Sequence, residues 1–317
     1  MYNYKKNKYN LTKILLLFLI FFLSIESSLF GIEKKYKKFT IIYNKQDELV
    51  ANKLTKEIQL EIIRIKKKYN LELNNFQIII SDSEDKFKGE FGKDFPDWAV
   101  AAAKYPSRKI ILKSPSFSKQ YIPELRKTVI HEMVHISLEP IIKNKYFPRW
   151  LNEGMAQYEA EQFSIQKKIL LGRILLYSDY MQLNKIDDVL KFKTRKANLA
   201  YAQSVSAFKF LIDEFGTENY KKFLIFLSEN QKVEDAFKNA YKFSLQEFES
   251  YWNLWAHKRY KFYVLIDINS MIWMLMPVLL LIAWIVVKNR NSQKFKQWED
   301  EELYELLKKE SEKKIEN

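Results

Sequence analysis

The chain has 317 residues, 47% apolar and 29% charged, so it is long and apolar enough to bury one sizeable core. Its formal net charge is +14, but the 45 Lys and 8 Arg lack the arginine clusters typical of phosphate-reading surfaces, so we expect no nucleic-acid partner. Cysteine is absent, which excludes disulfides, thiolate ligands and a cysteine nucleophile. Any metal site must therefore use histidines and carboxylates.

The N-terminus has the three-part layout of a secretory signal. Lysines without any acidic residue precede the apolar run Ile14–Leu23, and a mixed, serine-containing stretch follows up to Gly31. The run is short for a membrane span, and an uncleaved anchor is the alternative because Leu29–Gly31 is only a fair cleavage site. We predict that residues 1–31 are a signal peptide.

The first part of the following region predicts a small sheet. Phe39–Tyr43 and Phe76–Ile80 are short β-rich runs, and residues 46–68 between them have apolar side chains at helical spacing. A third strand is predicted at Lys109–Leu112, between two prolines. Residues Val100 to Ala103 predict a fourth, edge-like strand, because small side chains leave room for close backbone approach.

After these strands the pattern becomes helical. Pro123 can begin a helix and Pro140 can end it, and Pro148 marks the start of a second helix. Residues 203–259 predict several further helices, with breaks near Gly216, Asn230 and Phe243. Strands that come first and helices that follow predict an α+β domain.

Residues 268–287 predict a transmembrane helix. The segment has no charged residue, carries Trp273 and Trp284 near its ends, and is followed by a basic flank. A buried core helix is the alternative, which the apolar character of nearly all faces disfavours. Because basic flanks stay in the cytoplasm, we expect a single-pass protein of the cell membrane, with residues 288–317 as cytoplasmic tail and residues 32–262 as an extracytoplasmic domain.

The segment His131-Glu132-Met133-Val134-His135 carries the candidate chemistry. Residues four apart lie on one face of a helix, so His131 and His135 can present imidazole nitrogens to one metal ion. Glu132 then lies beside the metal, where a carboxylate can act as general acid and base in hydrolysis. The third ligand should come from a second helix packed across the first, and Glu153 is the best candidate.

Chance is a poor explanation of this motif, because the chain has only three histidines. The predicted helix is amphipathic, with Leu125, Ile130, Val134 and Leu138 on the face expected to meet the core. The alternative is that both histidines are hydrogen-bonded on a buried helix face without a metal.

HEMVH followed by PRWLNEGMAQY resembles the gluzincin clan of zinc metallopeptidases, in the form of the peptidase MA-like domains. The resemblance covers about residues 39–255. It implies a zincin-like fold with a small N-terminal mixed β-sheet and a helical C-terminal half. It also implies one zinc ion, held by His131, His135 and Glu153, with Glu132 as the catalytic base.

The resemblance implies further site residues. An edge strand of the family fold binds extended peptide by main-chain hydrogen bonds, a role that falls to Val100, Ala101, Ala102 and Ala103. Thermolysin-type members orient the first histidine with an aspartate four residues after the ligand glutamate, and this chain has Gln157 there. We expect Asn152 and Gln157 to support the ligands.

The oxyanion of the reaction needs a hydrogen-bond donor, which clan members usually supply as Tyr or His. Tyr201 is the candidate here and Tyr158 competes with it, while a role in the core is the alternative for a tyrosine in a chain with nineteen. His257, the remaining histidine, is interpreted as structural or solvent-facing.

The sequence thus predicts a membrane-anchored zinc metallopeptidase that hydrolyses a peptide or protein substrate in the extracytoplasmic space. The alternative is a catalytically inactive gluzincin-like binding or assembly module of the cell envelope. An intramembrane protease is disfavoured, because Arg126 and Lys127 lie about one turn before His131.

Overall fold

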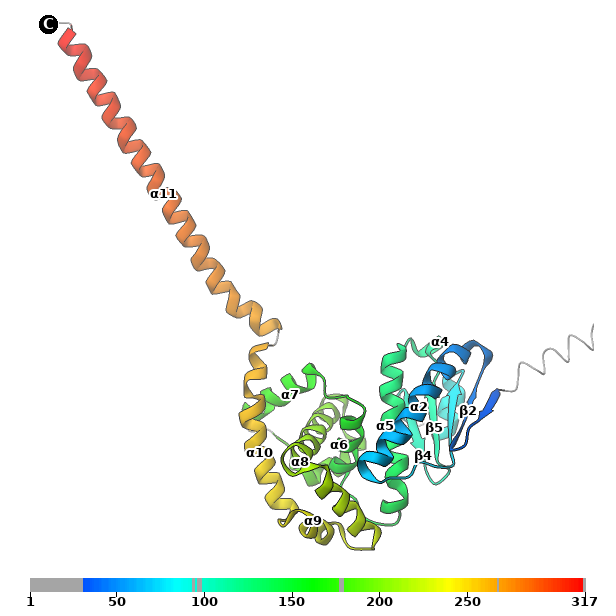
Figure 1. Ribbon diagram of the computed structural model, residues 1–317. Coiled ribbons are helices and arrows are strands. Elements are labelled where there is room, and N and C mark those ends of the chain that lie inside the picture. Colours follow the sequence, from blue (N-terminus) through cyan, green and yellow to red (C-terminus); the bar gives the residue numbers. More distant parts are fainter. Residues whose placement is uncertain (1–30, 93–94, 96–98, 177–179, 267, 316–317) are drawn as a thin grey trace, which may run out of the picture.

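The structure is a computed structural model that describes residues 31–92, 95, 99–176, 180–266 and 268–315. A small sheet with its covering helices lies on one side, a group of helices lies beside it, and the long helix α11 (Ile268–Ile315) leaves the domain (Figure 1). Almost all of the predicted signal peptide, residues 1–30, lies outside the described residues.

The sheet has five strands in the order β1-β2-β3-β5-β4. The inner strands β2, β3 and β5 are parallel, and the edge strands β1 and β4 are antiparallel to their neighbours, which confirms the predicted small mixed sheet. All four predicted strands form within one residue of their expected bounds, and β1 is an addition. The strands are β1 (Ile32–Lys35), β2 (Phe39–Tyr43), β3 (Phe76–Ser81), β4 (Ala101–Lys104) and β5 (Lys109–Lys113).

The strands of the sheet have buried residues at alternate positions, and helices cover the sheet. Phe39, Ile41 and Tyr43 of β2 are buried, as is every second residue from Phe76 to Ile80 of β3. The apolar stripe of α2 (Glu48–Tyr69) enters the same core cluster, and α5 (Ile122–Ile142) packs against α2, β4 and β5. Helix α3 (Glu84–Phe91) contacts β3 and β5.

The helical half follows α5, as expected. It comprises α6 (Arg149–Glu159), α7 (Ile165–Leu176), α8 (Thr194–Ser228), α9 (Val233–Tyr241) and α10 (Leu245–Tyr260). Shorter segments are η1 (Lys45–Asp47), α4 (Pro115–Ser118), η2 (Leu183–Lys191) and η3 (Lys261–Ile266). The predicted breaks are present: Gly216 has φ 78° inside α8, and Asn230 and Phe243 lie between helices.

Pro140 does not end α5, contrary to the expectation from sequence. The helix begins one residue before Pro123 and continues to Ile142. A proline costs one N–H bond and crowds the preceding turn. The helix nevertheless continues past Pro140 to Ile142, and the Lys143 N–H donates the last helical hydrogen bond to the Glu139 carbonyl at 2.9 Å.

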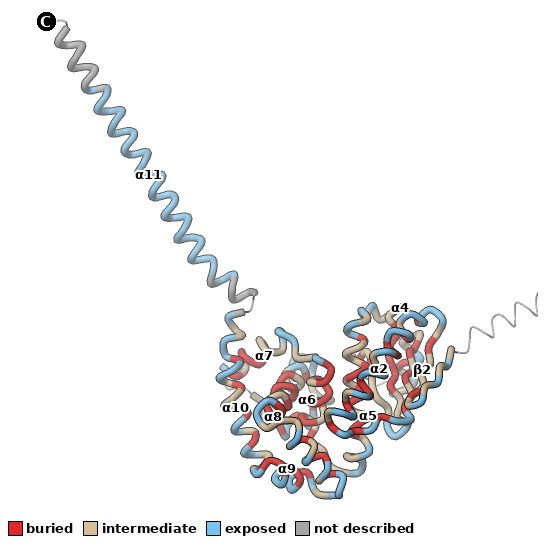
Figure 2. The backbone as a smooth tube through the Cα atoms, viewed as in Figure 1, coloured by how far each residue is buried: buried red, intermediate tan, exposed pale blue. Residues whose placement is uncertain are grey.

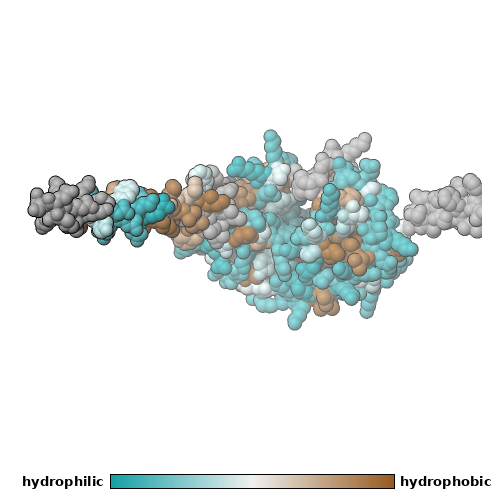
Figure 3. Space-filling view, turned by 90° about the horizontal axis from the view of Figure 1, so that it is seen from above, coloured by the Kyte–Doolittle hydropathy of each residue, from teal (hydrophilic) through white to brown (hydrophobic). Residues whose placement is uncertain are grey.

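Helix α11 is the one helix within the described ranges that is long and apolar enough to cross a membrane, over Leu275–Tyr304. None of these residues is buried, and the tube is pale blue here (Figure 2). Apolar surface lies on the part of α11 nearest the domain, and hydrophilic surface follows (Figure 3). The helix continues unbroken past residue 288, where we predicted the start of the tail.

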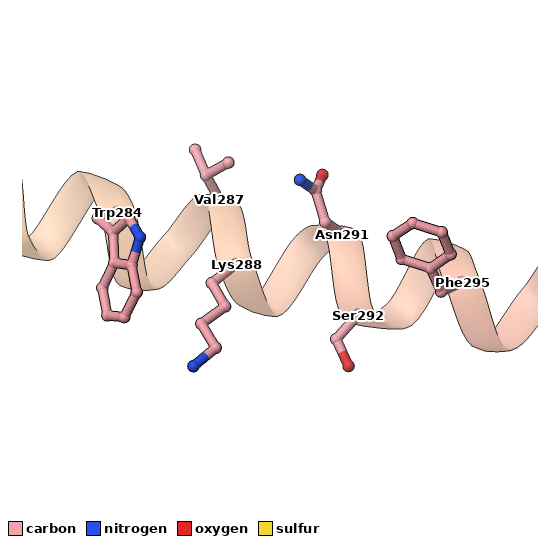
Figure 4. Close-up of a pocket in the computed structure, with 6 residues that line it drawn as sticks. All are labelled: Trp284, Val287, Lys288, Asn291, Ser292 and Phe295. Carbon is pink, nitrogen blue, oxygen red and sulfur yellow. The ribbon is translucent and has the colours of Figure 1, made fainter.

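An aromatic and a basic side chain stand where the apolar part of α11 ends. Lys288 Nζ lies 4.9 Å from the centroid of the Trp284 ring, a pairing typical of the membrane–water boundary. A shallow hollow lies here, and the side chains that line it, drawn in Figure 4, all come from α11: Trp284, Val287, Lys288, Asn291, Ser292 and Phe295. The hollow is therefore a feature of the surface of one helix, remote from the domain.

Gly154 lets α6 approach α8 closely. A Cβ atom at this position would lie 2.4 Å from the Ser204 carbonyl oxygen and 2.9 Å from Phe208 Cβ. Gly154 lies next to Glu153, so this contact also sets where the helix that carries Glu153 lies.

Replacing Gly154 by alanine should therefore destabilise the fold. We expect Gly154→Ala to lower the free energy of unfolding by about 1–3 kcal/mol, because backbone rather than a mobile side chain blocks the methyl group. Gly89→Ala is the control: its Cβ meets nothing within 4 Å, and the change should be neutral or stabilising by about 0.5–1 kcal/mol. Thermal unfolding of both purified variants checks this, and equal effects would contradict it.

Candidate metal centre

Two helices bring three potential metal ligands together. His131 and His135 lie one turn apart on α5, and Glu153 comes from α6, which packs against α5. The two Nε2 atoms are 3.1 Å apart, and Glu153 Oε2 lies 3.4 Å from the first and 3.7 Å from the second. These are the three residues for which the sequence predicted metal binding, and their side chains are 15%, 11% and 7% exposed.

The outer nitrogen of each imidazole faces a side-chain amide oxygen. His131 Nδ1 lies 3.0 Å from Gln162 Oε1, and His135 Nδ1 lies 2.8 Å from Asn152 Oδ1. An amide oxygen can only accept a hydrogen bond, so both Nδ1 atoms carry the proton. Both Nε2 atoms then face each other and Glu153 Oε2.

This donor set fits zinc. Two imidazole nitrogens and one carboxylate oxygen, each imidazole held by a hydrogen bond at its other nitrogen, are the ligands of hydrolytic zinc sites. When both imidazoles are neutral, the two Nε2 atoms and Glu153 Oε2 are three acceptors at one place, which a cation can bind together.

Glu153 is ionised at neutral pH. Burial raises the pKa of its carboxyl group, but His135, His131 and Arg149 outweigh burial and lower the pKa to about 2. Arg149, one turn earlier on α6, lies with Nη2 3.4 Å from Glu153 Oε1. Glu153 thus presents Oε2 to the histidines and Oε1 to an arginine.

Glu132 lies beside the ligands and is held by the sheet. The Ala103 N–H of β4 donates a hydrogen bond to Glu132 Oε2 at 2.8 Å, which leaves Oε1 without this contact. Burial raises the pKa of Glu132 to about 7; Glu153 adds to the rise, while His135 and the Ala103 N–H oppose it. A carboxyl group with this pKa can both accept and release a proton near neutral pH.

The free edge of β4 faces this helix. Lys113 N–H donates to the Val100 carbonyl, so in the antiparallel ladder Val100 and Ala102 point their backbone groups at β5. Ala101 and Ala103 then point theirs away from β5, which agrees with the bond from Ala103 to Glu132. Of the four residues expected to bind substrate, two therefore offer main-chain groups at the outer edge.

Tyr201 lies near the centre and Tyr158 does not. Burial raises the pKa of Tyr201, and the charges of Glu153 and Glu132 are among the causes. Tyr158 instead contacts Phe208, with ring centroids 5.4 Å apart. Burial and the charges of Asp213 and Glu159 raise its pKa.

Sequence reasoning missed Tyr105, which follows β4. Its pKa is raised by desolvation and then by the charges of Glu132 and Glu153, so its hydroxyl group lies near the same carboxylates as Tyr201. It is 45% exposed. Its position directly after the predicted edge strand was the one available signal.

Gln157 does not orient His131, which corrects the expectation from sequence. Its Nε2 donates to the Glu153 carbonyl at 3.4 Å, and its Oε1 accepts from Lys167 Nζ. Gln162 takes the place beside His131 instead. The cause is that α6 ends at Glu159 and the chain turns back, so a residue beyond the helix reaches the imidazole.

A buried ion-pair network fixes the end of α6 that precedes Gln162. The Glu159 side chain, 0% exposed, accepts from Arg64, from Lys68 Nζ at 2.8 Å and from the Tyr69 hydroxyl, all on α2. Removing one partner of a buried pair leaves an uncompensated charge, so this network resists displacement of α6.

Comparison with known families assigns the domain. The fold and the His, His, Glu group are those of a gluzincin-like peptidase domain. The family model of the peptidase MA superfamily matches residues 60–258, and the chain belongs to this superfamily. Comparison with curated proteins finds no match.

Gln162 should support zinc binding more than Gln157 does. We expect Gln162→Ala to weaken zinc affinity about 10- to 100-fold, because His131 Nδ1 loses its acceptor. Gln157→Ala, whose side chain contacts Lys167 and the helix backbone, should change affinity less than about threefold. Competition with a chromogenic chelator measures both, and a larger loss in Gln157→Ala would contradict the assignment.

Proposed function

We propose that this protein is a membrane-anchored zinc metallopeptidase that cleaves peptide bonds in the extracytoplasmic space. The observation that carries the proposal is the convergence of His131 Nε2, His135 Nε2 and Glu153 Oε2, with Glu132 adjacent on the same helix. Membership of the peptidase MA superfamily supports it, since its members are typically zinc-dependent peptidases.

His131, His135 and Glu153 would hold the zinc ion, which supplies Lewis acidity toward a scissile carbonyl and toward water. Glu132 takes a proton from the attacking water and passes it to the leaving amine. The Ala103 N–H, bound to Oε2, keeps that carboxylate in place and leaves Oε1 for the proton.

The substrate would bind as an added strand on β4. Ala101 presents an outward N–H and carbonyl, and Ala103 an outward carbonyl, because its N–H is bound to Glu132. An extended peptide can pair with these groups while its scissile bond lies beside Glu132. Short alanine side chains leave the edge accessible. Val100 bonds back to Lys113, so its contribution is to hold the strand.

Tyr201 would donate a hydrogen bond to the developing oxyanion. Its raised pKa keeps the hydroxyl group protonated, as a donor must be. Tyr105 is a second candidate for this task, because its hydroxyl group is influenced by the same two carboxylates.

The anchoring follows from two segments. Residues 1–31 would direct export, and residues 268–287 within α11 would span the membrane, with residues 32–262 outside and residues 288–317 in the cytoplasm. Trp284 and Lys288 would mark the cytoplasmic boundary, in keeping with the tendency of basic flanks to stay inside.

The competing function is an inactive binding or assembly module of the cell envelope. Such a module would need the fold, but it would not need the metal ligands or the catalytic glutamate. The complete set of ligands, the retained Glu132 and the two supporting amides favour the peptidase, because a module without turnover has no need of them.

The decisive variant is Glu132→Gln. We expect one zinc per chain in both wild type and variant, and at least a 100-fold loss of cleavage in the variant, because the amide cannot accept the water's proton. Elemental analysis gives the zinc content, and mass spectrometry of an unbiased peptide library gives cleavage.

Glu124→Gln is the matched control, since Glu124 is an exposed glutamate in the first turn of the same helix. It should cleave like wild type. Zinc binding without cleavage by the wild type would favour the binding module, and full activity in Glu132→Gln would disprove the assigned mechanism.

The topology can be tested by cysteine labelling, because the chain has no cysteine. Gln59 on α2 and Gln297 on α11 are both exposed. In intact cells a membrane-impermeant maleimide should label Gln59→Cys and spare Gln297→Cys, which should react only after permeabilisation. The opposite pattern would place the domain in the cytoplasm.

A further inference from the structure

Segment η3 joins the peptidase domain to α11, and it carries large apolar side chains that the described part of the domain leaves exposed. Phe262 and Leu265 are 62% and 53% exposed. Residue 267 alone separates the end of η3 at Ile266 from the start of α11 at Ile268. Exposed apolar side chains that cluster in this way mark a contact with another molecule or with a membrane.

Helix α7 packs tightly on η3 and on the end of α10. A Cβ atom on Gly172 would lie 2.5 Å from the carbonyl oxygen of Tyr260, so the two backbones are nearly in contact. Lys168 Nζ lies 5.7 Å from the ring centroid of Tyr263 on η3. Figure 1 shows α7 beside the point where α11 leaves the domain, and η3 contacts both helices.

Helix α7 adds apolar surface to that of η3. Ile165, one turn before Lys168, is 41% exposed. Three further apolar side chains of the helix are half-buried, namely Ile169, Leu170 and Ile174. We call the exposed apolar side chains of the two segments, Ile165, Phe262 and Leu265, the η3–α7 face.

The charged residues of these two segments are all basic. Helix α7 has two lysines and one arginine, residues 256–266 have the same, and neither segment has an aspartate or glutamate. Lys258, Arg259 and Lys261 are exposed. Arg259 Cζ lies 5.1 Å from the ring centroid of Trp255, and Lys261 Nζ lies 4.9 Å from that of Phe262. Basic side chains beside aromatic and aliphatic ones suit the boundary between lipid headgroups and acyl chains.

We propose that the η3–α7 face lies on the anionic lipid headgroups of the membrane that α11 crosses. This inference rests on the proposed anchoring by α11. With one residue between them, the Cα atoms of Ile266 and Ile268 are at most about 7 Å apart, so η3 cannot lie far from the bilayer. The bilayer is therefore the one surface that the chain itself brings to this face.

The basic side chains would meet lipid phosphates while the apolar ones enter the headgroup layer. Each lysine or arginine near an anionic surface should raise the ratio of docked to undocked domains about fivefold. Lys258 and Lys261 are the best placed to do so, because both are exposed and both lie within about a turn of η3 or on it.

Docking would hold the metal centre at a fixed height above the bilayer. Gln162, which contacts His131, lies three residues before α7 begins. Lys167 of α7 donates a hydrogen bond to Gln157 of α6. Because α7 is thus joined to the centre at one side and to η3 at the other, the centre would reach peptide bonds close to the membrane surface.

The test uses single cysteines in the full-length chain, which has none of its own, in vesicles of phosphatidylcholine with about 30% phosphatidylglycerol. Ile165→Cys carries an environment-sensitive fluorophore, and a lipid with a nitroxide headgroup is the quencher. We expect the nitroxide lipid to lower the fluorescence at least about twofold, because the face lies in the headgroup layer.

Leu60→Cys is the matched control for position. Leu60 is 62% exposed on α2, which lies with the sheet and apart from α7 (Figure 1). Its label should be quenched by less than about a tenth, because it lies beyond the headgroup layer. Equal quenching at the two positions would overturn the inference.

The charge is tested in the labelled Ile165→Cys chain. Lys258→Gln combined with Lys261→Gln should lower the docked-to-undocked ratio about fivefold for each lysine, and vesicles without phosphatidylglycerol should likewise reduce quenching. Lys53→Gln combined with Lys56→Gln, two exposed lysines at the same spacing on α2, should leave quenching unchanged. Equal quenching in neutral and anionic vesicles would contradict docking on anionic lipid.

Flotation of the vesicles in a density gradient separates this inference from the proposed anchoring. A chain that does not float lacks the anchor, and the inference fails with it. A chain that floats without quenching at Ile165→Cys keeps the anchor and overturns the inference alone. Shielding of this label that depends on the protein-to-lipid ratio and not on the nitroxide lipid would mean that a second copy covers the face, which also overturns it.

Discussion

The packing of α6 against α5 is the constraint on which the centre depends. It brings Glu153 Oε2 within 3.4 Å of His131 Nε2 and 3.7 Å of His135 Nε2. Contacts outside the centre fix this approach. Gly154 does so on one side, by letting the backbone meet Ser204 of α8. Glu159 does so at the end of α6, through the buried ion pair with Arg64.

The same helix connects the metal ligands to the sheet. Glu132 is the residue after the first histidine, so it points to a different face of α5 and meets the Ala103 N–H of β4. This bond uses an outward backbone group of an edge strand, which in an open sheet is free to pair. In the proposed mechanism one contact would therefore position both the substrate strand and the carboxylate that transfers the proton, and a shift of β4 along α5 would disturb both.

Local patterns in the sequence predicted what local geometry determines. The spacing of His131 and His135 fixes their common face on any α-helix, and short β-rich runs, bounding prolines and a run of small side chains located four of the five strands. The contacts between residues that are distant in the sequence were harder to predict. Gln157 has the family spacing, yet Gln162 reaches His131 because of the turn after α6. Tyr105 and β1 were missed for the same reason, since turn geometry and pairing partner decide their positions.

The buried carboxylates at the two ends of α6 differ in how their charge is compensated. Glu159 is fully buried and accepts from Arg64 and Lys68 of α2. Glu153 is paired with Arg149 only through Oε1, the oxygen that faces away from the histidines. Its Oε2, which faces the two imidazoles, has no lysine or arginine partner among the described residues. In the proposed function a zinc ion at this place would supply the missing positive charge. The same helix therefore carries one carboxylate that the fold neutralises and one that it leaves for a ligand.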